Sequence, residues 1–281
     1  MILSYRPIVY SISVTGQKCE LMCKHCRGVF LRNMKWISNG NELLEAFHEA
    51  RRKEIKFILI SGGFDRNGRL PIEHLLDYIK RAKEETGLIV EAHLGLFKDF
   101  KKIGGIDALL LDVIGSQDTI TNYIKGNWNV EDYEFVMKEA RRFIPLIAAH
   151  ILIGVDCGRI KGEYNAIDMV ERANVDALSI LTLVQGNYEF EDLVKIMKYA
   201  RDRYKGHLTL GCMRTKGRKR FLIEKIAIEL GYNGIANPSV EAINYAKNLG
   251  LEVKELLGCC VFTPNRIPMN TRLQRFHLVD M

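Results

Sequence analysis

The chain has 281 residues, of which 47% are hydrophobic and 27% are charged, with 23 Gly and 6 Pro. This composition excludes a disordered or fibrous protein, and the length suits one α/β barrel or two smaller domains. Lys and Arg outnumber Asp and Glu by 41 to 34. The resulting charge of +7 leaves room for an acidic partner but is too small to indicate a nucleic-acid-binding protein.

The seven cysteines are an odd number, and the N-terminus has no signal-peptide pattern, so a secreted disulfide framework is not expected. The longest apolar stretch, residues 144–155, contains Pro145 and His150 and is too short to cross a bilayer. We therefore expect a cytoplasmic protein without a membrane partner, whose cysteines serve chemistry.

Short β-rich runs alternate with amphipathic helical stretches along the chain. The predicted strands cover residues 8–14, 57–61, 88–94, 108–113, 146–154, 177–182, 208–211 and 234–237. The predicted helices cover residues 42–53, 71–85, 130–143, 163–173, 190–204, 218–230 and 239–249. This alternation indicates βαβ units, and continuous apolar runs such as residues 57–60 are typical of parallel strands buried on both faces.

Eight such units would close a barrel. We therefore predict an α/β fold, a (β/α) TIM-like barrel of parallel strands, complete or nearly complete, with its working face at the C-terminal strand ends. A doubly wound open sheet is the alternative. We expect residues 1–281 to form a single domain, with residues 255–281 as a C-terminal extension that packs at the barrel mouth.

Three cysteines, Cys19, Cys23 and Cys26, form a CxxxCxxC triplet directly after the first predicted strand. At this cysteine content, chance would produce such a triplet only about 0.004 times per sequence of this length. A zinc site usually takes four protein ligands, and His25 is awkwardly placed as the fourth because it adjoins Cys26. An iron–sulfur cluster takes cysteine thiolates readily, and a cluster held by three of them leaves one iron open.

The triplet, in a loop after the first strand of a predicted βα barrel, resembles the radical S-adenosylmethionine (SAM) superfamily. The resemblance implies that Cys19, Cys23 and Cys26 bind a [4Fe–4S] cluster whose open iron chelates SAM. Electron transfer then cleaves SAM to a 5′-deoxyadenosyl radical, which abstracts hydrogen from an unactivated carbon. Within the superfamily, the chain is most similar to the biotin-synthase-like branch, which includes the archaeal-type two-component lipoyl synthases.

The same resemblance implies SAM-binding positions. Gly62 and Gly63 follow the second strand, where the superfamily has a Gly-Gly-Glu motif that meets the SAM amino group. Phe64 and Asp65 replace the usual Glu, so only backbone carbonyls are expected to make that contact. Further strand-end residues are predicted to contact SAM or substrate: His93, Asp112, Ile153 and Gly154. An ordinary strand-end role is the alternative for His93 and Asp112, and His150 carries the same two interpretations.

The other four cysteines, Cys157, Cys212, Cys259 and Cys260, are distant in sequence but could converge at the rim of the barrel. By resemblance to the sulfur-inserting enzymes of this branch, they would hold a second iron–sulfur cluster that donates sulfide. The alternative is that they are small buried hydrophobic residues, as free cysteines often are.

A basic run after Cys212 contains Arg214, Arg218 and Arg220. Basic side chains are unusual at a helix N-terminus because the helix dipole disfavours them there. The run therefore predicts an anionic ligand, which would be a substrate carboxylate or phosphate or an acidic carrier protein. A solvated loop and helix start is the alternative, and the lack of interleaved aromatic residues argues against nucleic acid.

We therefore expect a radical-SAM enzyme that abstracts hydrogen from an aliphatic carbon, with sulfur insertion of the lipoyl-synthase kind as the most specific hypothesis. The resemblance implies a small-molecule or acyl-carrier substrate, a reductant such as ferredoxin or flavodoxin, and a second radical-SAM subunit. One alternative is a radical-SAM rearrangement, C–C bond or cofactor-maturation enzyme without sulfur insertion. The other is a non-catalytic zinc or iron–sulfur binding module that recruits an acidic partner. No catalytic residue is identified at this stage.

Overall fold

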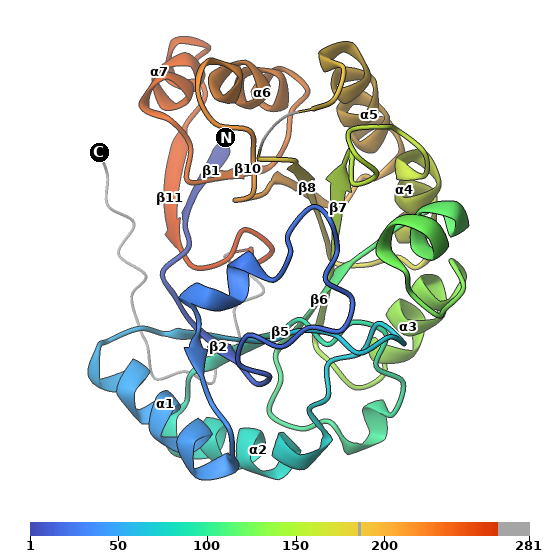
Figure 1. Ribbon diagram of the computed structural model, residues 1–281. Helices are drawn as coiled ribbons and strands as arrows, with labels where there is room; N and C mark the ends of the chain where they lie inside the picture. The colour runs from blue at the N-terminus through green and yellow to red at the C-terminus, as the bar shows by residue number, and fades with distance from the viewer. Residues whose placement is uncertain (185–186, 264–281) are drawn as a thin grey trace.

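Parallel strands alternate with helices in the computed structural model, which describes residues 1–184 and 187–263. Within these residues, eleven strands form one parallel sheet that curls round, and helices lie outside it (Figure 1). The strands are β1 (Ile2–Arg6), β2 (Val9–Ser13), β3 (Lys35–Trp36), β4 (Phe57–Ser61), β5 (Ile89–Ala92), β6 (Ala108–Asp112), β7 (Leu146–Ile153), β8 (Ala177–Thr182), β9 (His207–Leu210), β10 (Gly234–Ala236) and β11 (Val253–Leu257). Their order is β11-β1-β10-β9-β8-β7-β6-β5-β4-β2-β3, which confirms the predicted TIM-like α/β fold.

The two ends of this sheet meet on one stretch of chain. β1 pairs with β10 and β11, whereas β2 pairs with β3 and β4 at the other end of the strand order. Only Pro7 and Ile8 separate β1 from β2. The first barrel strand is therefore split, and its two halves join opposite ends of the curled sheet. Because Pro7 lacks a backbone N–H, it suits the point where the chain changes its pairing partner.

Local signals set the ends of several helices. The Asn39 side chain accepts a hydrogen bond from the Glu42 N–H at 3.1 Å at the start of the first helix, and Gly87, at φ 68°, ends the second. In the described part of the chain the α-helices are α1 (Gly40–Arg52), α2 (Leu76–Thr86), α3 (Asp132–Ala140), α4 (Glu163–Arg172), α5 (Phe190–Arg203), α6 (Arg218–Glu229) and α7 (Val240–Asn248). Shorter helical segments are η1 (Val29–Asn33), η2 (Glu73–Leu75), η3 (Phe100–Lys102) and the π-helical η4 (Thr119–Ile124). None of the helices described here has the length and apolar character that crossing a membrane requires.

Side chains on each strand alternate between the helix side and the barrel interior, because the period of a strand is two residues. On β4, Ile58 and Ile60 belong to the main core that the helices cover, whereas Phe57 and Leu59 belong to a separate cluster. The same alternation assigns polar side chains of neighbouring strands to the interior: Glu91, His93, Asp112 and His150. The interior is therefore apolar where the strands begin and polar where they end.

The segment after β11 fills the apolar end of the interior. Val261 and Phe262 pack against residues at the starts of five strands: Phe57, Ile89, Ala108, Leu146 and Ala177. The Tyr5 hydroxyl donates to the Phe262 carbonyl at 2.7 Å and holds this segment in place. The sequence analysis put residues 255–281 at the mouth. Residues 264–281 lie outside the described residues, and residues 261–262 lie at the opposite end, where their apolar side chains cover the strand starts.

Three strands, β1, β3 and β11, are not predicted by the sequence analysis. β3 has only two residues, which is too short for a period-two pattern to be recognised. β11 contains Lys254 and Glu255, and it tolerates these charges because it pairs on one side only, with β1.

Candidate functional site

The cysteine triplet lies in the loop that follows β2, and this loop crosses the front of the barrel in Figure 1. Cys19, Cys23 and Cys26 are half-buried and form no disulfide. The Cys26 N–H donates to the Cys23 carbonyl at 3.1 Å, so a turn brings these two residues together. Each thiol lies close enough to affect the ionisation of a neighbour. The structure therefore gathers the three cysteines at the C-terminal end of the strands.

Gly62 and Gly63 pack closely against this loop. A Cβ atom on Gly63 would lie 2.0 Å from the Lys18 carbonyl oxygen and 2.5 Å from the Cys19 Cα, so only glycine fits there. The Gly63 N–H also donates to Thr15 Oγ1 at 2.7 Å. The end of β4 and the triplet loop are consequently one packed unit, in which Gly63 lies against Cys19 and Gly62 against Thr15.

The residues that replace the usual Glu of the Gly-Gly-Glu motif have local structural roles. Asp65 accepts the backbone N–H groups of Asn67 and Arg69 at 2.8 and 3.0 Å, and it forms an ion pair with the Arg69 side chain. The Phe64 carbonyl accepts the Glu20 N–H at 3.0 Å. Asp65 therefore stabilises its own turn, and its oxygens already have partners among the loop residues.

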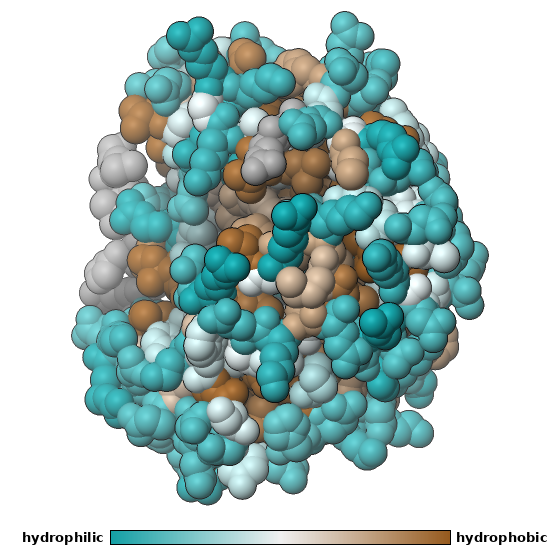
Figure 2. Space-filling view, in the orientation of Figure 1, coloured by the Kyte–Doolittle hydropathy of each residue, from teal (hydrophilic) through white to brown (hydrophobic). Residues whose placement is uncertain are grey.

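Apolar side chains surround the triplet. Cys19 and Cys23 pack against a cluster formed by Leu21, Tyr123, Ile124 and Val155. Figure 2 shows hydrophobic side chains in the hollow of this face, with hydrophilic residues around them.

Burial, together with the neighbouring thiols, raises the pKa of Cys23 to about 12, and burial also raises the pKa of Cys26. Three thiolates are therefore stable in this site only when a cation compensates their charge.

The distances between the three thiols distinguish a single zinc ion from an iron–sulfur cluster. Tetrahedral zinc with Zn–S bonds of 2.3 Å places its sulfur ligands about 3.8 Å apart. Among the described residues, however, the one group of three His, Cys, Asp or Glu ligand atoms within 4.8 Å of one another contains no cysteine. His25 stands between Cys23 and Cys26 in the sequence, and its buried Nδ1 atom has no hydrogen-bond partner. Three clustered but wider-spaced thiols fit a multinuclear iron–sulfur cluster better than a single zinc ion.

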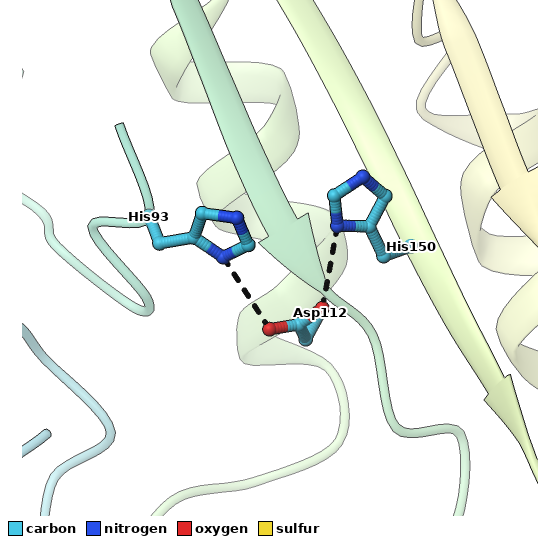
Figure 3. A group of neighbouring side chains, drawn as sticks. All are labelled: His93, Asp112 and His150. Atoms are coloured by element: carbon cyan, nitrogen blue, oxygen red, sulfur yellow. Dashed lines mark ion pairs between the residues drawn. The ribbon is translucent and has the colours of Figure 1, made fainter. Parts of the chain in front are cut away.

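A second polar group lies at the ends of three adjacent strands. His93 follows β5, Asp112 ends β6 and His150 lies in β7, directly opposite Asp112 in the strand register. The Nδ1 atoms of His93 and His150 lie 3.5 and 3.4 Å from the two Asp112 carboxylate oxygens, and both rings point toward that carboxylate (Figure 3). The Asp112 charge also affects the thiols of Cys23 and Cys26. This group and the triplet therefore share the mouth of the barrel.

The sequence analysis names these three residues separately but does not predict that they converge. Adjacent parallel strands end at the same edge of the sheet. The available signal was therefore that all three residues lie within three residues of a strand end. Asp112 keeps 54% of its side chain exposed, but the protein around it still displaces water and opposes ionisation. The hydrogen bonds and charges of the two imidazoles outweigh this desolvation and lower the pKa of Asp112, so the carboxylate is ionised.

A buried layer of side chains, which includes Glu91, lies beneath this group. No role for Glu91 is predicted from the sequence. Glu91 is 2% exposed, and its Oε2 has no hydrogen-bond partner. Burial raises the pKa of Glu91 to about 8, so this carboxyl group is mainly protonated at neutral pH. Cys260 is 3.6 Å from Ser179 Oγ, and the interaction of its thiol with Cys259 lowers the pKa of Cys260 while it raises that of Cys259.

A shallow pocket, open to solvent, lies between the ends of β6 and β7 and the start of α4. Ile114, Leu152 and Val155 line it and also contact the apolar cluster around the triplet. The sequence analysis assigned Ile153 to this area, but its side chain is fully buried in the helix-side core, because it points away from Leu152. Gly154 is nearby, and its N–H is held by Glu163 Oε1 at 2.8 Å.

The four other cysteines do not form one group of ligands. Cys157 is exposed and interacts with Tyr123, whereas Cys259 and Cys260 lie inside the barrel near Glu91. Cys212 is exposed and close enough to Cys260 for their charges to interact. In the described chain, no three of these sulfurs lie within 4.8 Å of one another. The expected convergence of all four is not observed, because their strand ends and the C-terminal segment place them at different depths.

The basic run is largely occupied by contacts within the protein. Arg214 is 5% exposed and pairs with the buried Glu224 at 2.9 Å, and Arg220 pairs with the same carboxylate at 3.0 Å. Both arginines also donate to the Asn237 carbonyl. The prediction that Arg214 binds an external anion is therefore corrected, since its buried guanidinium pairs with Glu224. Arg220 shares the same carboxylate but keeps 39% of its side chain exposed. Arg218, at the start of α6, is exposed.

The fold is similar to that of several solved structures. They include methylornithine synthase (PylB), at 13% identity and a TM-score of 0.55, which covers 83% of this chain and 72% of the other. Streptococcus suis SuiB bound to S-adenosylmethionine has 15% identity and a TM-score of 0.53, and the match covers 90% of this chain but only 57% of SuiB. HMG-CoA lyase from Bacillus subtilis has 12% identity and a TM-score of 0.52, with 88% and 89% covered. No protein-family model matches the sequence, and no curated protein is significantly similar to it. At these identities the similarities show a shared barrel fold.

Proposed function

We propose that this protein is a radical-SAM enzyme that abstracts hydrogen from an aliphatic carbon of its substrate. The observation that carries this proposal is the gathering of three free thiols, Cys19, Cys23 and Cys26, in one loop at the mouth of a parallel barrel, with Gly63 packed against Cys19. The fold similarity to a SAM-bound protein, SuiB, supports it. When bound, a [4Fe–4S] cluster and SAM would supply the one-electron cleavage that generates a 5′-deoxyadenosyl radical.

The residues of the chain have distinct parts in this proposal. Cys19, Cys23 and Cys26 bind the cluster, and the site favours a cationic centre because burial raises the pKa of Cys23 and of Cys26. The backbone of Gly62 and Gly63 holds the amino group of SAM. The apolar side chains around the triplet exclude water, which protects a reactive radical from side reactions.

The pocket beside the triplet supports a position for the rest of SAM. Ile114, Leu152 and Val155 offer an apolar surface for the adenine ring, and the Gly154 backbone lies next to them. The substrate would then enter the polar interior near His150. A reductant such as ferredoxin or flavodoxin would supply the electron, and the basic Lys24 and Arg27 are exposed on the triplet loop toward an acidic partner.

The separation of the other cysteines favours a reaction without sulfur insertion. A second cluster held by all four would need them in one place, but Cys157 is exposed beside Tyr123, whereas Cys259 and Cys260 lie inside the barrel near Glu91. We therefore favour a rearrangement, C–C bond or cofactor-maturation reaction on a small-molecule or acyl-carrier substrate. Sulfur insertion, with a second radical-SAM subunit, is the competing proposal, and iron analysis distinguishes them, since two cubane clusters require about eight iron atoms per chain and one requires about four.

The test is anaerobic reconstitution of the full chain with iron and sulfide, followed by reduction with dithionite in the presence of SAM. We expect an EPR signal of a reduced cubane cluster that changes when SAM is added, and formation of 5′-deoxyadenosine. Replacement of Cys19, Cys23 and Cys26 by Ala should abolish both. Cys157→Ala is the matched control, because this cysteine is exposed and outside the triplet. Reductive cleavage of SAM by the triple variant would overturn the proposal.

A further inference from the structure

Three side chains inside the barrel have the composition and spacing of a metal site that is separate from the cysteine triplet. His93, Asp112 and His150 each present one ligand atom, and these atoms all lie within 4.8 Å of one another. His93 directly follows β5, Asp112 ends β6 and His150 lies within β7, and these three strands are adjacent in the sheet. A site built on three strands is held more precisely than one built on a loop.

The distances are longer than those of good hydrogen bonds. An N–H···O hydrogen bond normally spans about 2.7–3.2 Å, whereas His93 Nδ1 and His150 Nδ1 lie 3.5 and 3.4 Å from the Asp112 oxygens. Ligands of a tetrahedral ion with bonds of about 2.0–2.1 Å lie about 3.3–3.4 Å apart. Both His–Asp separations are therefore close to those that a shared ion would impose and longer than those of a tightly hydrogen-bonded triad, and the ligand atoms of the two histidines lie within 4.8 Å of each other.

The cluster of His93, Asp112 and His150 is open to solvent on the side of Asp112 and closed by protein on the side of His150. Asp112 keeps 54% of its side chain exposed, whereas the His150 side chain is only 10% exposed. Beneath them, Glu91 is buried at the next inward position of β5, with one carboxyl oxygen unpartnered. An ion here would have three protein ligands and an open position toward the mouth, which is the arrangement of a catalytic metal site.

We propose that His93 Nδ1, Asp112 and His150 Nδ1 bind one divalent first-row transition metal ion, such as Zn²⁺, Co²⁺ or Fe²⁺. Two imidazoles and one carboxylate suit these ions, and the ligand set with open positions is that of mononuclear non-haem centres. The open position takes a carboxylate or carbonyl oxygen of the substrate and orients it in the barrel interior. This assignment replaces the expected contact of His93 and Asp112 with SAM, and it does not depend on radical chemistry.

The first measurement is a titration of full-length protein with CoCl₂ after treatment with chelator, in a variant with Cys19, Cys23 and Cys26 replaced by Ser. Removing the triplet leaves Cys157, Cys212, Cys259 and Cys260. Cobalt bound to any of these thiolates would show intense sulfur-to-metal charge-transfer absorption, whereas nitrogen and oxygen ligands give only weak visible d–d absorption. We expect one equivalent of Co²⁺ to bind, and ZnCl₂ to displace it in a calorimetric titration.

Ligand variants in the same background decide whether the ion sits at this position. His150→Ala and the nearly isosteric Asp112→Asn should each weaken Co²⁺ binding by about tenfold or more. His74→Ala, at an exposed histidine on η2, is the matched control and should bind like its parent. Circular dichroism checks the fold, and Asp112→Asn carries the test if His150→Ala is misfolded.

Two results would overturn the proposal: no cobalt binding with nitrogen and oxygen ligands in the variant without the triplet, or such binding that Asp112→Asn leaves unchanged. Because the variant without the triplet cannot hold the proposed iron–sulfur cluster, cobalt binding there is independent of the proposed radical function. Metal analysis of the reconstituted wild type gives a second readout, in which a transition metal beyond the iron of the cluster is expected, and its loss in Asp112→Asn supports the same site.

Discussion

Gly63 lies so close to Cys19 that a Cβ atom at position 63 would be 2.5 Å from both the Cα and the Cβ of Cys19. The Lys18 carbonyl oxygen would lie still closer, at 2.0 Å. Because these neighbours are mainly backbone atoms, they cannot rotate away as a flexible side chain would. The position of the first cysteine is therefore coupled to the turn that ends β4.

This coupling predicts a specific effect of Gly63→Ala. The added methyl group should displace the triplet loop, so reconstituted protein should hold less than half of the wild-type iron and sulfide while its circular dichroism spectrum is retained. Gly104→Ala is the matched control, because a Cβ there meets only the flexible Lys80 side chain at 3.4 Å. Wild-type iron content in Gly63→Ala would show that the loop position is not set by this contact.

Glu91 makes the stability of the metal-free protein depend on pH. Its pKa is raised to about 8 by burial, whereas in the unfolded chain it titrates near the ordinary value of about 4.3. Between pH 5 and 8 the native state thus keeps a proton that the unfolded state has lost. The contribution of Glu91 to the free energy of unfolding therefore falls as pH rises, by up to about 1.4 kcal/mol per pH unit.

Glu91→Gln removes this titration, so the variant should gain stability relative to wild type as pH rises from 5 to 8. Urea denaturation at several pH values, with chelator present, measures the difference. Glu84→Gln, at an exposed position on α2, should show no such trend. A constant difference between Glu91→Gln and wild type at all pH values would contradict the prediction.

Glu224 holds together the region that follows β9. Its carboxylate pairs with Arg214 and Arg220. It also accepts a hydrogen bond at 2.5 Å from the hydroxyl of Ser239, the residue that caps the N-terminus of α7. Glu224→Ala leaves the Arg214 guanidinium buried without its charge partner, so unfolding should require about 3–5 kcal/mol less free energy. Lys219→Ala, exposed on the same helix, should stay within about 0.5 kcal/mol of wild type in chemical denaturation. A wild-type midpoint for Glu224→Ala would refute this role.

Phe262 closes the end of the barrel opposite the triplet. It is 2% exposed, and its ring centroid lies 5.5 Å from that of Phe57. Phe262→Ala should lower the free energy of unfolding by about 3–5 kcal/mol, because it opens a cavity among the strand starts. Val240→Ala, at a residue that is 71% exposed, provides the comparison. Calorimetric melting that is equal for both variants would show that the segment after β11 is not part of the core.

Much of the barrel could be predicted from the chain alone. Apolar runs such as β4 and β8 are recognisable because both faces of a parallel strand are buried, and the observed bounds of these two strands equal the predicted ones. The split of the first strand into β1 and β2 could not be predicted, because it depends on two different pairing partners at opposite ends of the sheet.

The sequence by itself determined the alternation of strands and helices and the grouping of Cys19, Cys23 and Cys26, because both depend on residues near one another in the chain. Only the tertiary structure decided which distant polar groups meet. It brings His93, Asp112 and His150 together and disperses the other cysteines. It also turns Arg214 inward to Glu224. These outcomes follow from strand register and depth in the barrel, which the pairing of the whole sheet sets and no local pattern contains.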